Sequence, residues 1–224
     1  MPASNPNTTH DRVYAPGADY SAIAFHEAAH VVVATATRSG IVQSVELAPE
    51  FGVHGWATIG HINDRFNDIL SGDEAGRQYL VARLTEAISG AVADHITGYG
   101  AVSYEEWLER ERENQWCDGP DDAPDPMSDY AVVLRLSLLC GMTPSEAWAR
   151  ADQLLREPAV WRAVETIADA LVSLKDQGLP SVLSADELRA ITDEVDWPAG
   201  YRTTTIEDAM DLVRAHARQA GRPW

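Results

Sequence analysis

The spacing of hydrophobic and polar residues along the chain predicts a protein built mainly of helices. Residues 19–37 are apolar on nearly every side, with AIAFHEAAHVVVA at their centre, which is typical of a buried helix. Apolar residues at helical spacing predict a second, long helix over 73–96. Capping patterns, in which Ser or Thr is followed three residues later by Glu, predict helix starts at Thr143, Ser184 and Thr204.

A small β element is expected directly after the first helix. Residues 41–47, IVQSVEL, alternate and are rich in β-branched side chains, and residues 56–59, WATI, have the same character. Turn residues separate the two segments, which favours a β-hairpin or the edge of a small sheet. The fold class that we expect is therefore mainly α, with a β-hairpin or edge sheet after the first helix.

Composition divides the chain into three regions. Residues 1–18 are rich in Pro, Asn, Thr and Gly and are expected to form a flexible N-terminal tail. Residues 19–192 are expected to form one domain, interrupted by an acidic insert at 104–128. Residues 193–224 are expected to form a linker and a C-terminal helix. A chain of 224 residues is long enough for such a domain to bury a substantial core.

The chain is strongly acidic, with 35 acidic residues against 17 basic ones and a net charge of −18. This balance argues against nucleic acid and against anionic membrane surfaces as partners, because both attract basic proteins. Nearly half of the charge lies in residues 104–129, where ten acidic residues less two basic ones leave −8. A solvated segment is expected for this insert, whose first half could be a short polar helix and whose residues 118–126 form a loop; a lid and an oligomer contact are the alternatives.

The lysine and cysteine content narrows the class of protein further. Lys175 is the only lysine, and because Asp176 follows it, it cannot belong to the Walker loop of an ATPase. Two cysteines, Cys117 and Cys140, are too few for a disulfide scaffold or a cysteine-built zinc site. The sequence shows neither a secretory signal nor an apolar stretch long enough to span a membrane. We therefore expect a cytoplasmic protein.

The chemistry of the sequence is concentrated in the buried helix, where His26, Glu27 and His30 form an HExxH motif. Residues four apart lie on one face of a helix, so both imidazoles can bind one zinc ion. Glu27 lies beside them and can take a proton from a zinc-bound water, whose pKa the metal lowers to about 7. Without a metal, burying two imidazoles and a carboxylate would be costly. The motif therefore predicts a zinc site with Glu27 as the general base.

A hydrolytic zinc site usually has a third protein ligand, and the pattern of residues leaves several candidates open. Asp94 and His95 lie on or beside the apolar stripe of their predicted helix, and Asp129 immediately precedes a short apolar helix. The other candidates are His54, His61, Glu105 and Glu106. Spacing alone does not choose among them.

The segment Ala24–His30, AFHEAAH, resembles the zinc peptidase domain of FtsH-type ATP-dependent proteases, which carry HEAGH on a buried helix. Later segments are similar to parts of that domain in the same order. They are residues 42–59 (VQSVELAPEFGVHGWATI), 83–96 (RLTEAISGAVADHI), 128–143, which begin with SD and end with GMT, and 149–191. The resemblance covers about residues 20–192. It implies the mainly helical fold of that domain as a stand-alone protein, without the AAA+ ATPase module and the membrane helices.

The resemblance also implies roles for individual residues. It implies zinc on His26 and His30, with Asp129 as the third ligand, because Asp129 matches the metal-binding aspartate of the family. Asp94 matches the first Glu of the family's AEE motif, which implies a supporting or structural role. His95 stands where the family has an acidic residue, and Asp94 or His95 is the next candidate ligand after Asp129.

The function that we expect is a zinc-dependent endopeptidase that cleaves flexible polypeptides without its own ATPase. The substrate would lie extended along the second predicted strand and add a strand to it through main-chain hydrogen bonds. The residues expected there are Gly52, Val53, Trp56, Ala57 and Thr58. The alternative is an inactive or structural zinc-binding module that acts through a protein partner. A homo-oligomer or a separate partner protein is compatible with either function.

Overall fold

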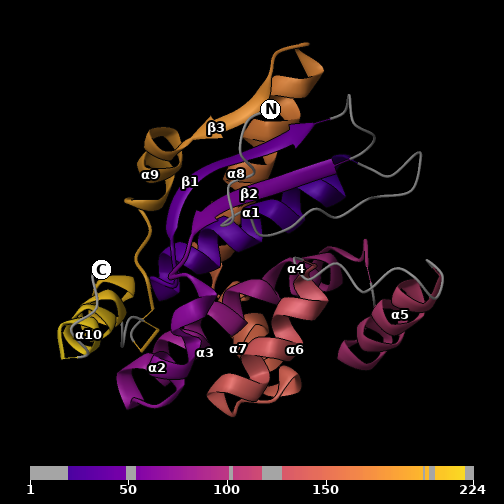
Figure 1. Ribbon diagram of the computed structural model, residues 1–224. Coiled ribbons are helices and arrows are strands. Elements are labelled where there is room, and N and C mark those ends of the chain that lie inside the picture. Colours follow the sequence, from indigo (N-terminus) through magenta and orange to yellow (C-terminus); the bar gives the residue numbers. More distant parts are fainter. Residues whose placement is uncertain are drawn as a thin grey trace, which may run out of the picture.

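The computed structural model describes residues 20–48, 54–100, 103–117, 128–198, 200–201 and 205–219. It is mainly helical with a small antiparallel sheet, which confirms the predicted fold class (Figure 1). The helices are α1 Tyr20–Thr37, α2 Asn67–Ser71, α3 Glu74–Ala87, α4 Ser89–Thr97, α5 Tyr104–Cys117, α6 Asp129–Cys140, α7 Pro144–Leu155, α8 Pro158–Asp176, α9 Ala185–Thr192 and α10 Ile206–Gln219, with a short 3-10 helix, η1, at Asp64–Phe66. The strands are β1 Ile41–Ala48, β2 His54–Gly60 and β3 Ser181–Ser184. Among the described residues, no helix is long and apolar enough to cross a membrane.

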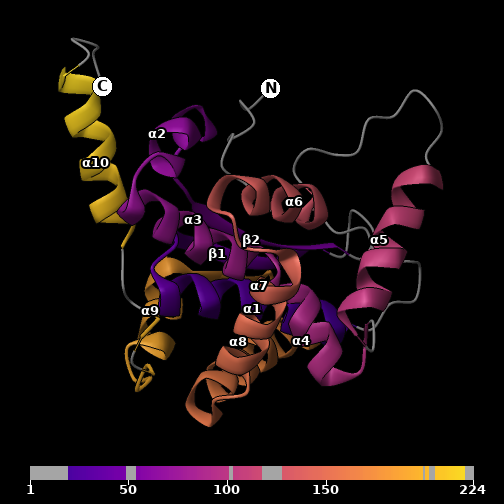
Figure 2. The same cartoon turned by 90° about the horizontal axis from the view of Figure 1, so that it is seen from below.

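Helix α1 runs through the interior and contacts both the strands and the helices. Half of its residues are Ala or Val, small apolar residues that let neighbours approach closely on every side. Helices α3, α4 and α8 pack against it, and so do β1 and β2. Seen from below, α3, α4, α6 and α7 lie in front of the strands, and α5 and α10 lie at opposite ends of the molecule (Figure 2). The predicted burial of the first helix is therefore confirmed, and the HExxH motif lies inside the core.

The sheet has the strand order β2-β1-β3, and both pairs are antiparallel. β1 and β2 form the predicted hairpin. Val45 pairs with Ala57 on one side and with Leu183 on the other, and this row of buried side chains lies on the inner face of the sheet. The hydrophobic pattern alone does not reveal β3, because four residues are too few for a periodic signal.

The region over 73–96 contains two helices, α3 and α4, which meet at Ile88, so the prediction of one continuous helix is wrong. The Ser89 hydroxyl donates a 2.6 Å hydrogen bond to the carbonyl oxygen of Glu86 and so competes with the regular helical bonds. Gly90 follows and is a weak helix former. Apolar residues continue at helical spacing across this junction, which is why the pattern gives no sign of it.

The predicted capping boxes of α7 and α9 are present, whereas that of α10 is shifted by one residue. Helix α10 begins at Ile206, and Thr205 exchanges hydrogen bonds of 3.0 and 3.2 Å with Asp208. Thr205 and Asp208 therefore form the reciprocal cap in place of the predicted Thr204 and Glu207, and Thr204 itself lies outside the described residues. Consecutive threonines followed by consecutive acids present the same pattern in two registers, and the sequence does not distinguish them.

The described half of the acidic insert is helix α5, which is attached to the core by aromatic residues. The Trp107 side chain is buried, and its ring centroid lies 5.9 Å from those of Tyr130 on α6 and Trp148 on α7. Tyr104 joins the same cluster. Glu105, Glu109 and Glu113 are exposed. The rest of the insert, residues 118–127, lies outside the described residues.

Candidate metal centre

Two histidine nitrogens of α1 face each other inside the core. His26 and His30 are one helical turn apart, and neither is exposed to solvent. Their Nε2 atoms lie 3.2 Å apart, and the centroids of their rings lie 5.0 Å apart. The two imidazoles thus lie on one face of α1, as the HExxH spacing predicts.

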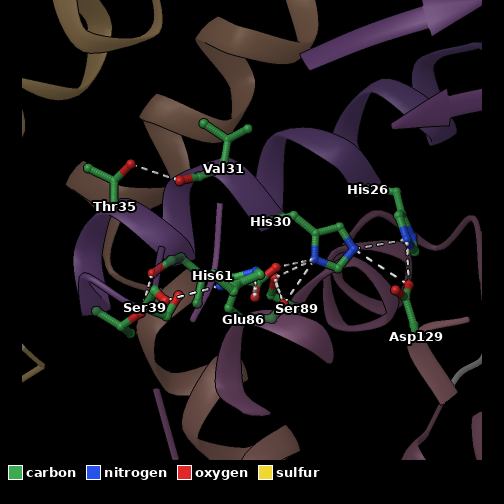
Figure 3. A network of polar contacts seen from close by, with 11 residues as sticks. His26, His30, Val31, Thr35, Ser39, His61, Glu86, Ser89 and Asp129 are labelled. Atoms are coloured by element: carbon green, nitrogen blue, oxygen red, sulfur yellow. Dashed lines mark hydrogen bonds and ion pairs between the residues drawn. The ribbon is translucent and has the colours of Figure 1, made fainter. Parts of the chain in front are cut away.

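Asp129 brings a carboxylate to these histidines from a distant part of the chain. It is the first residue of α6, a helix that Ser128 caps by accepting a 3.3 Å hydrogen bond from the amide of Ala131. Asp129 Oδ2 lies 3.2 Å from His26 Nε2 and 3.5 Å from His30 Nε2 (Figure 3). The three ligand atoms lie within 4.8 Å of one another, so this group could hold a metal ion.

Helix α6 is fixed on both its apolar and its polar side, which holds Asp129 in place. Its buried apolar residues are Tyr130, Val132, Val133 and Leu136. On the polar side, Arg135 lies 3.0 Å from one carboxylate oxygen of Asp64, and Arg83 of α3 lies 3.1 Å from the other. Burial raises the pKa of Asp64, but the two guanidinium groups outweigh it and lower this pKa overall. The ionised Asp64 therefore ties the helix that carries Asp129 to α3.

The opposite ring nitrogens of the two histidines face hydrogen-bond acceptors. His26 Nδ1 lies 3.0 Å from Asp94 Oδ2, and His30 Nδ1 lies 2.9 Å from the backbone carbonyl oxygen of Glu86. A neutral imidazole carries its hydrogen on the nitrogen that faces the acceptor and presents a lone pair on the other. Both Nε2 lone pairs therefore point toward the ligand group, which is the arrangement that acceptors behind metal-binding histidines produce.

The donor set fits a cation of the size of zinc. Two imidazole lone pairs and a carboxylate oxygen converge at one point, and such a set of electron-pair donors is stabilised by a cation between them. Ligands at about 2.0–2.1 Å from a tetrahedral ion lie about 3.3 Å from one another. The three distances between the ligand atoms are 3.2, 3.2 and 3.5 Å.

Gly90 of α4 leaves the space beside the two histidine nitrogens open. A Cβ atom at this position would lie 2.4 Å from His26 Nε2 and 2.5 Å from His30 Nε2, which is too close for any side chain. The junction of α3 and α4 thus places both the Glu86 carbonyl and Gly90 at the site. Sequence reasoning missed both, because one acts through its backbone and the other through the absence of a side chain. An isolated glycine within a helical pattern was the only available signal.

Glu27 lies on the same turn of α1 as the histidines and is fully buried. Its side chain packs against β2, where a Cβ atom on Gly55 would come within 2.9 Å of Glu27 Cγ and 2.5 Å of Ile23 Cγ2. The close approach of β2 to α1 therefore depends on Gly55. The charge of Glu27 also acts on His30. Burial, the largest effect, lowers the pKa of His30, but the hydrogen bond and charge of Glu86 and the charge of Glu27 outweigh it and raise this pKa overall.

The other candidate ligands are not part of the metal-binding group. His95 follows Asp94 on α4, and its ring packs against Trp148 with the centroids 5.9 Å apart. His61 lies behind Glu86, with 3.4 Å between His61 Nε2 and Glu86 Oε2. Within the described residues, the three-membered group of His26, His30 and Asp129 includes neither of them, nor Glu105 and Glu106 of α5. The side chain of His54 lies outside the described part of the chain.

The predicted substrate strand is present as β2, with its residues on two faces. Ala57 is buried on the side of α1, whereas Trp56 and Thr58 are half-buried on the opposite face of the sheet. Gly52 and Val53 lie outside the described residues. The structure therefore places the central part of the predicted strand next to the helix of the HExxH motif.

Comparison with known proteins adds no family to this geometry. No protein-family model matches the sequence, and no curated protein matches it either. Function therefore has to be inferred from the chemistry of the site.

Proposed function

We propose that this protein is a zinc-dependent endopeptidase that cleaves flexible polypeptides. The observation that carries the proposal is the group of His26, His30 and Asp129, whose ligand atoms lie 3.2–3.5 Å apart. Glu27 lies on the same helical turn as the histidines. Two histidines and a carboxylate with an adjacent glutamate are the residues that metal-dependent peptide hydrolysis uses. The resemblance of the surrounding segments to FtsH-type peptidase domains supports the same function.

Zinc is the metal that best suits these ligands. Imidazole and carboxylate are its common ligands in hydrolytic enzymes, and three protein ligands leave a fourth position for water or substrate. Zinc bound there would lower the pKa of a water molecule to about 7 and polarise the carbonyl group of the substrate. The donor set therefore favours a catalytic zinc site over a four-ligand structural one.

One residue of the chain would then transfer the proton, and two others would orient the histidine ligands. A carboxylate oxygen of Glu27 would accept the proton of the attacking water and deliver it to the amine that leaves when the peptide bond breaks. The Asp94 carboxylate would hold the ring of His26, and the Glu86 carbonyl would hold that of His30.

The substrate is proposed to bind along the outer edge of β2. β2 pairs with β1 on one side, and no strand among the described residues pairs with its other side. An extended peptide can bind such an edge through main-chain hydrogen bonds. Because β2 approaches Glu27 through Gly55, this peptide would pass close to the site. Flexible substrates are proposed because the sequence contains no Walker loop, and a cytoplasmic location because its cysteine content is low.

A second candidate function is a zinc-binding module that has no activity of its own and acts through a partner protein. The observation that favours it is burial: both histidines are inaccessible, and only 15 % of the Asp129 side chain is exposed. Structural zinc sites are closed in a similar way.

Cleavage of casein and of a peptide library by zinc-loaded protein separates the two functions. The wild type should cleave, and Glu27→Gln should not, because an amide cannot accept the proton. Both proteins should contain the same amount of zinc. Glu194→Gln removes an exposed charge elsewhere and should remain active. A wild type that binds zinc stoichiometrically but cleaves no peptide would overturn the peptidase proposal in favour of the binding module.

A further inference from the structure

A second group of buried polar residues lies behind His30, on the side of its Nδ1 atom (Figure 3). Glu86 is 1 % exposed, and His61 is 9 % exposed. Neither belongs to the HExxH motif or to the metal-binding group. Burying a carboxyl group and an imidazole is costly unless each finds a polar partner, so their common position requires an explanation.

Glu86 stands between two imidazoles. His30 Nδ1 lies 2.9 Å from the Glu86 carbonyl oxygen and 3.5 Å from Glu86 Oε1. On the other side, His61 Nε2 lies 3.4 Å from Glu86 Oε2. The far nitrogen of His61 is held as well, because its Nδ1 donates a 3.1 Å hydrogen bond to the carbonyl oxygen of Ser39. A continuous series of contacts therefore runs from Ser39, two residues after the end of α1, through His61 and Glu86, back to His30.

The His61 ring has little freedom to move. A Cβ atom on Gly40 would lie 2.9 Å from both Nδ1 and Cε1 of this ring, so the ring occupies the space beside the glycine. Burial lowers the pKa of His61 to about 4, with help from the nearby charge of Arg83. The ring is therefore neutral at neutral pH, and its Nδ1 hydrogen is used by Ser39. Because Nδ1 carries the only ring hydrogen, Nε2 has none to donate, and the ring limits the position of the Glu86 side chain by packing rather than by a hydrogen bond.

The Glu86 backbone is available to His30 because α3 ends at this point. Its carbonyl oxygen accepts hydrogen bonds from both His30 and the Ser89 hydroxyl, at 2.9 and 2.6 Å. The two hydrogen bonds hold this carbonyl, and the His61 ring packs against the side chain of the same residue, 3.4 Å from Glu86 Oε2.

We infer that Glu86 and His61 form a positioning pair that fixes the ring of the metal ligand His30 through the end of α3. The inference rests on the metal site of the proposed function. It assigns a role to two residues outside the HExxH motif. Loss of groups that orient a metal ligand typically weakens metal binding by about 10- to 100-fold.

Zinc affinity of Glu86 variants, measured by competition with a chromophoric chelator at pH 7.5, tests the inference. Glu86→Leu keeps the approximate volume of the side chain and should bind zinc about 10- to 100-fold more weakly than the wild type. Glu86→Gln keeps polar atoms at the positions of both carboxylate oxygens, and its zinc affinity should stay within about threefold of that of the wild type. Thr85→Val is the matched control, because Thr85 is the buried neighbour of Glu86 and bonds only to the Val81 carbonyl; its zinc affinity should not change.

Cobalt-loaded protein supplies a spectroscopic readout that a general loss of stability would not produce. The visible absorption bands of Co²⁺ should change in Glu86→Leu and remain those of the wild type in Glu86→Gln and Thr85→Val. Equal zinc affinity in Glu86→Leu and Thr85→Val would overturn the inference. Equal weakening in Glu86→Leu and Glu86→Gln would overturn it as well, because the polar atoms that Gln retains would then not position His30.

His61 variants test the pair when Glu86→Leu does not fold. The amide of His61→Gln can reach the position of Nε2 and keep the contact with Glu86, so zinc affinity should be nearly unchanged. The amide of His61→Asn reaches only the position of Nδ1, so zinc affinity should fall about 10-fold. The same affinity in both variants would overturn the inference. A wild type that binds zinc but cleaves nothing would overturn only the peptidase function, whereas a wild type that binds no zinc would overturn both.

Discussion

The candidate metal centre is built from two regions that contribute in opposite ways, helix α1 and the junction between α3 and α4. Helix α1 supplies three polar side chains, His26, Glu27 and His30, whose types and spacing already indicate metal chemistry. The junction supplies a backbone carbonyl at Glu86 and an empty position at Gly90. The comparison shows that candidate ligands can be read from residue types, whereas the groups that contact them from behind and the open space beside them depend on where the chain bends.

The largest expected effect tests the ligands themselves. Asp129→Ala removes one of three ligand atoms, so the purified protein should contain no stoichiometric zinc by elemental analysis. Asp94→Ala removes only the acceptor behind His26 and should weaken binding by about 10- to 100-fold without abolishing it. Zinc retained in Asp129→Ala but lost in Asp94→Ala would show that the ligand assignment is wrong.

The next effect tests the junction. Gly90→Ala introduces a methyl group 2.4–2.5 Å from both histidine nitrogens and should abolish stoichiometric zinc binding. Gly72→Ala is the control, because a Cβ atom there meets only the Asp68 and Ile69 carbonyls at 3.3 and 3.6 Å and lies at the end of α2. Normal zinc content in a folded Gly90→Ala protein would contradict this comparison, because the junction of α3 and α4 would then not form a wall of the metal site.

The pH dependence of stability tests the buried side of the junction. His61 has a pKa of about 4 in the folded protein against 6.5 in the unfolded chain. Above pH 6.5 neither state binds this proton, so the contribution of the neutral ring is complete there. As the pH falls from 6.5 toward 4, the unfolded chain takes up a proton that the folded protein does not, and stability is lost.

Urea unfolding of the metal-free wild type and of His61→Gln at pH 7 and pH 5 measures this loss. The wild type should lose about 2 kcal/mol more than the variant between these two values. The variant serves as the control because the other titrating groups are the same in both proteins. An equal loss in the two proteins would show that His61 is not held in its neutral form.

The smallest expected effect concerns the cap of α10, which lies outside both regions. It shows how zinc affinity responds when stability changes away from the candidate site. Thr205→Ala removes the reciprocal cap of α10 and should lower the free energy of unfolding by about 1 kcal/mol, with no change in zinc affinity. Thr204→Ala should have a smaller effect on unfolding, since Thr205 and Asp208 form the cap. A larger loss of stability in Thr204→Ala than in Thr205→Ala would show that Thr204 caps the helix, as the sequence pattern predicts.

Much of the fold follows from patterns that are long enough to be unambiguous. The buried helix α1, the hairpin of β1 and β2 and the capping boxes at Thr143 and Ser184 are present as predicted. The pattern fails where the signal is short or duplicated, as in the four residues of β3 and at Thr204, or where it continues across a break, as at Ile88. These failures reflect local competition between hydrogen bonds that hydrophobic spacing does not record.

Sequence patterns predicted the residues that could bind a metal ion at the candidate site, but not the residues that lie behind them. His26 and His30 follow from spacing, and the resemblance of the Ser128–Asp129 segment directs attention to Asp129, which lies 103 residues from His26 in the chain. The sequence did not indicate that Glu86 and His61 lie behind His30, because the residues that they contact there are more than 20 positions away in the chain. Only packing in three dimensions brings such residues together.

An anomalous-diffraction map recorded at the zinc absorption edge, from crystals of the zinc-loaded protein, tests the central claim most directly. The account predicts one strong peak at about 2.0–2.2 Å from His26 Nε2, His30 Nε2 and an Asp129 carboxylate oxygen. Glu27 should lie beside the peak without coordinating it. A peak coordinated by Asp94 or Glu86 in place of Asp129, or no peak between the two histidines, would contradict the account.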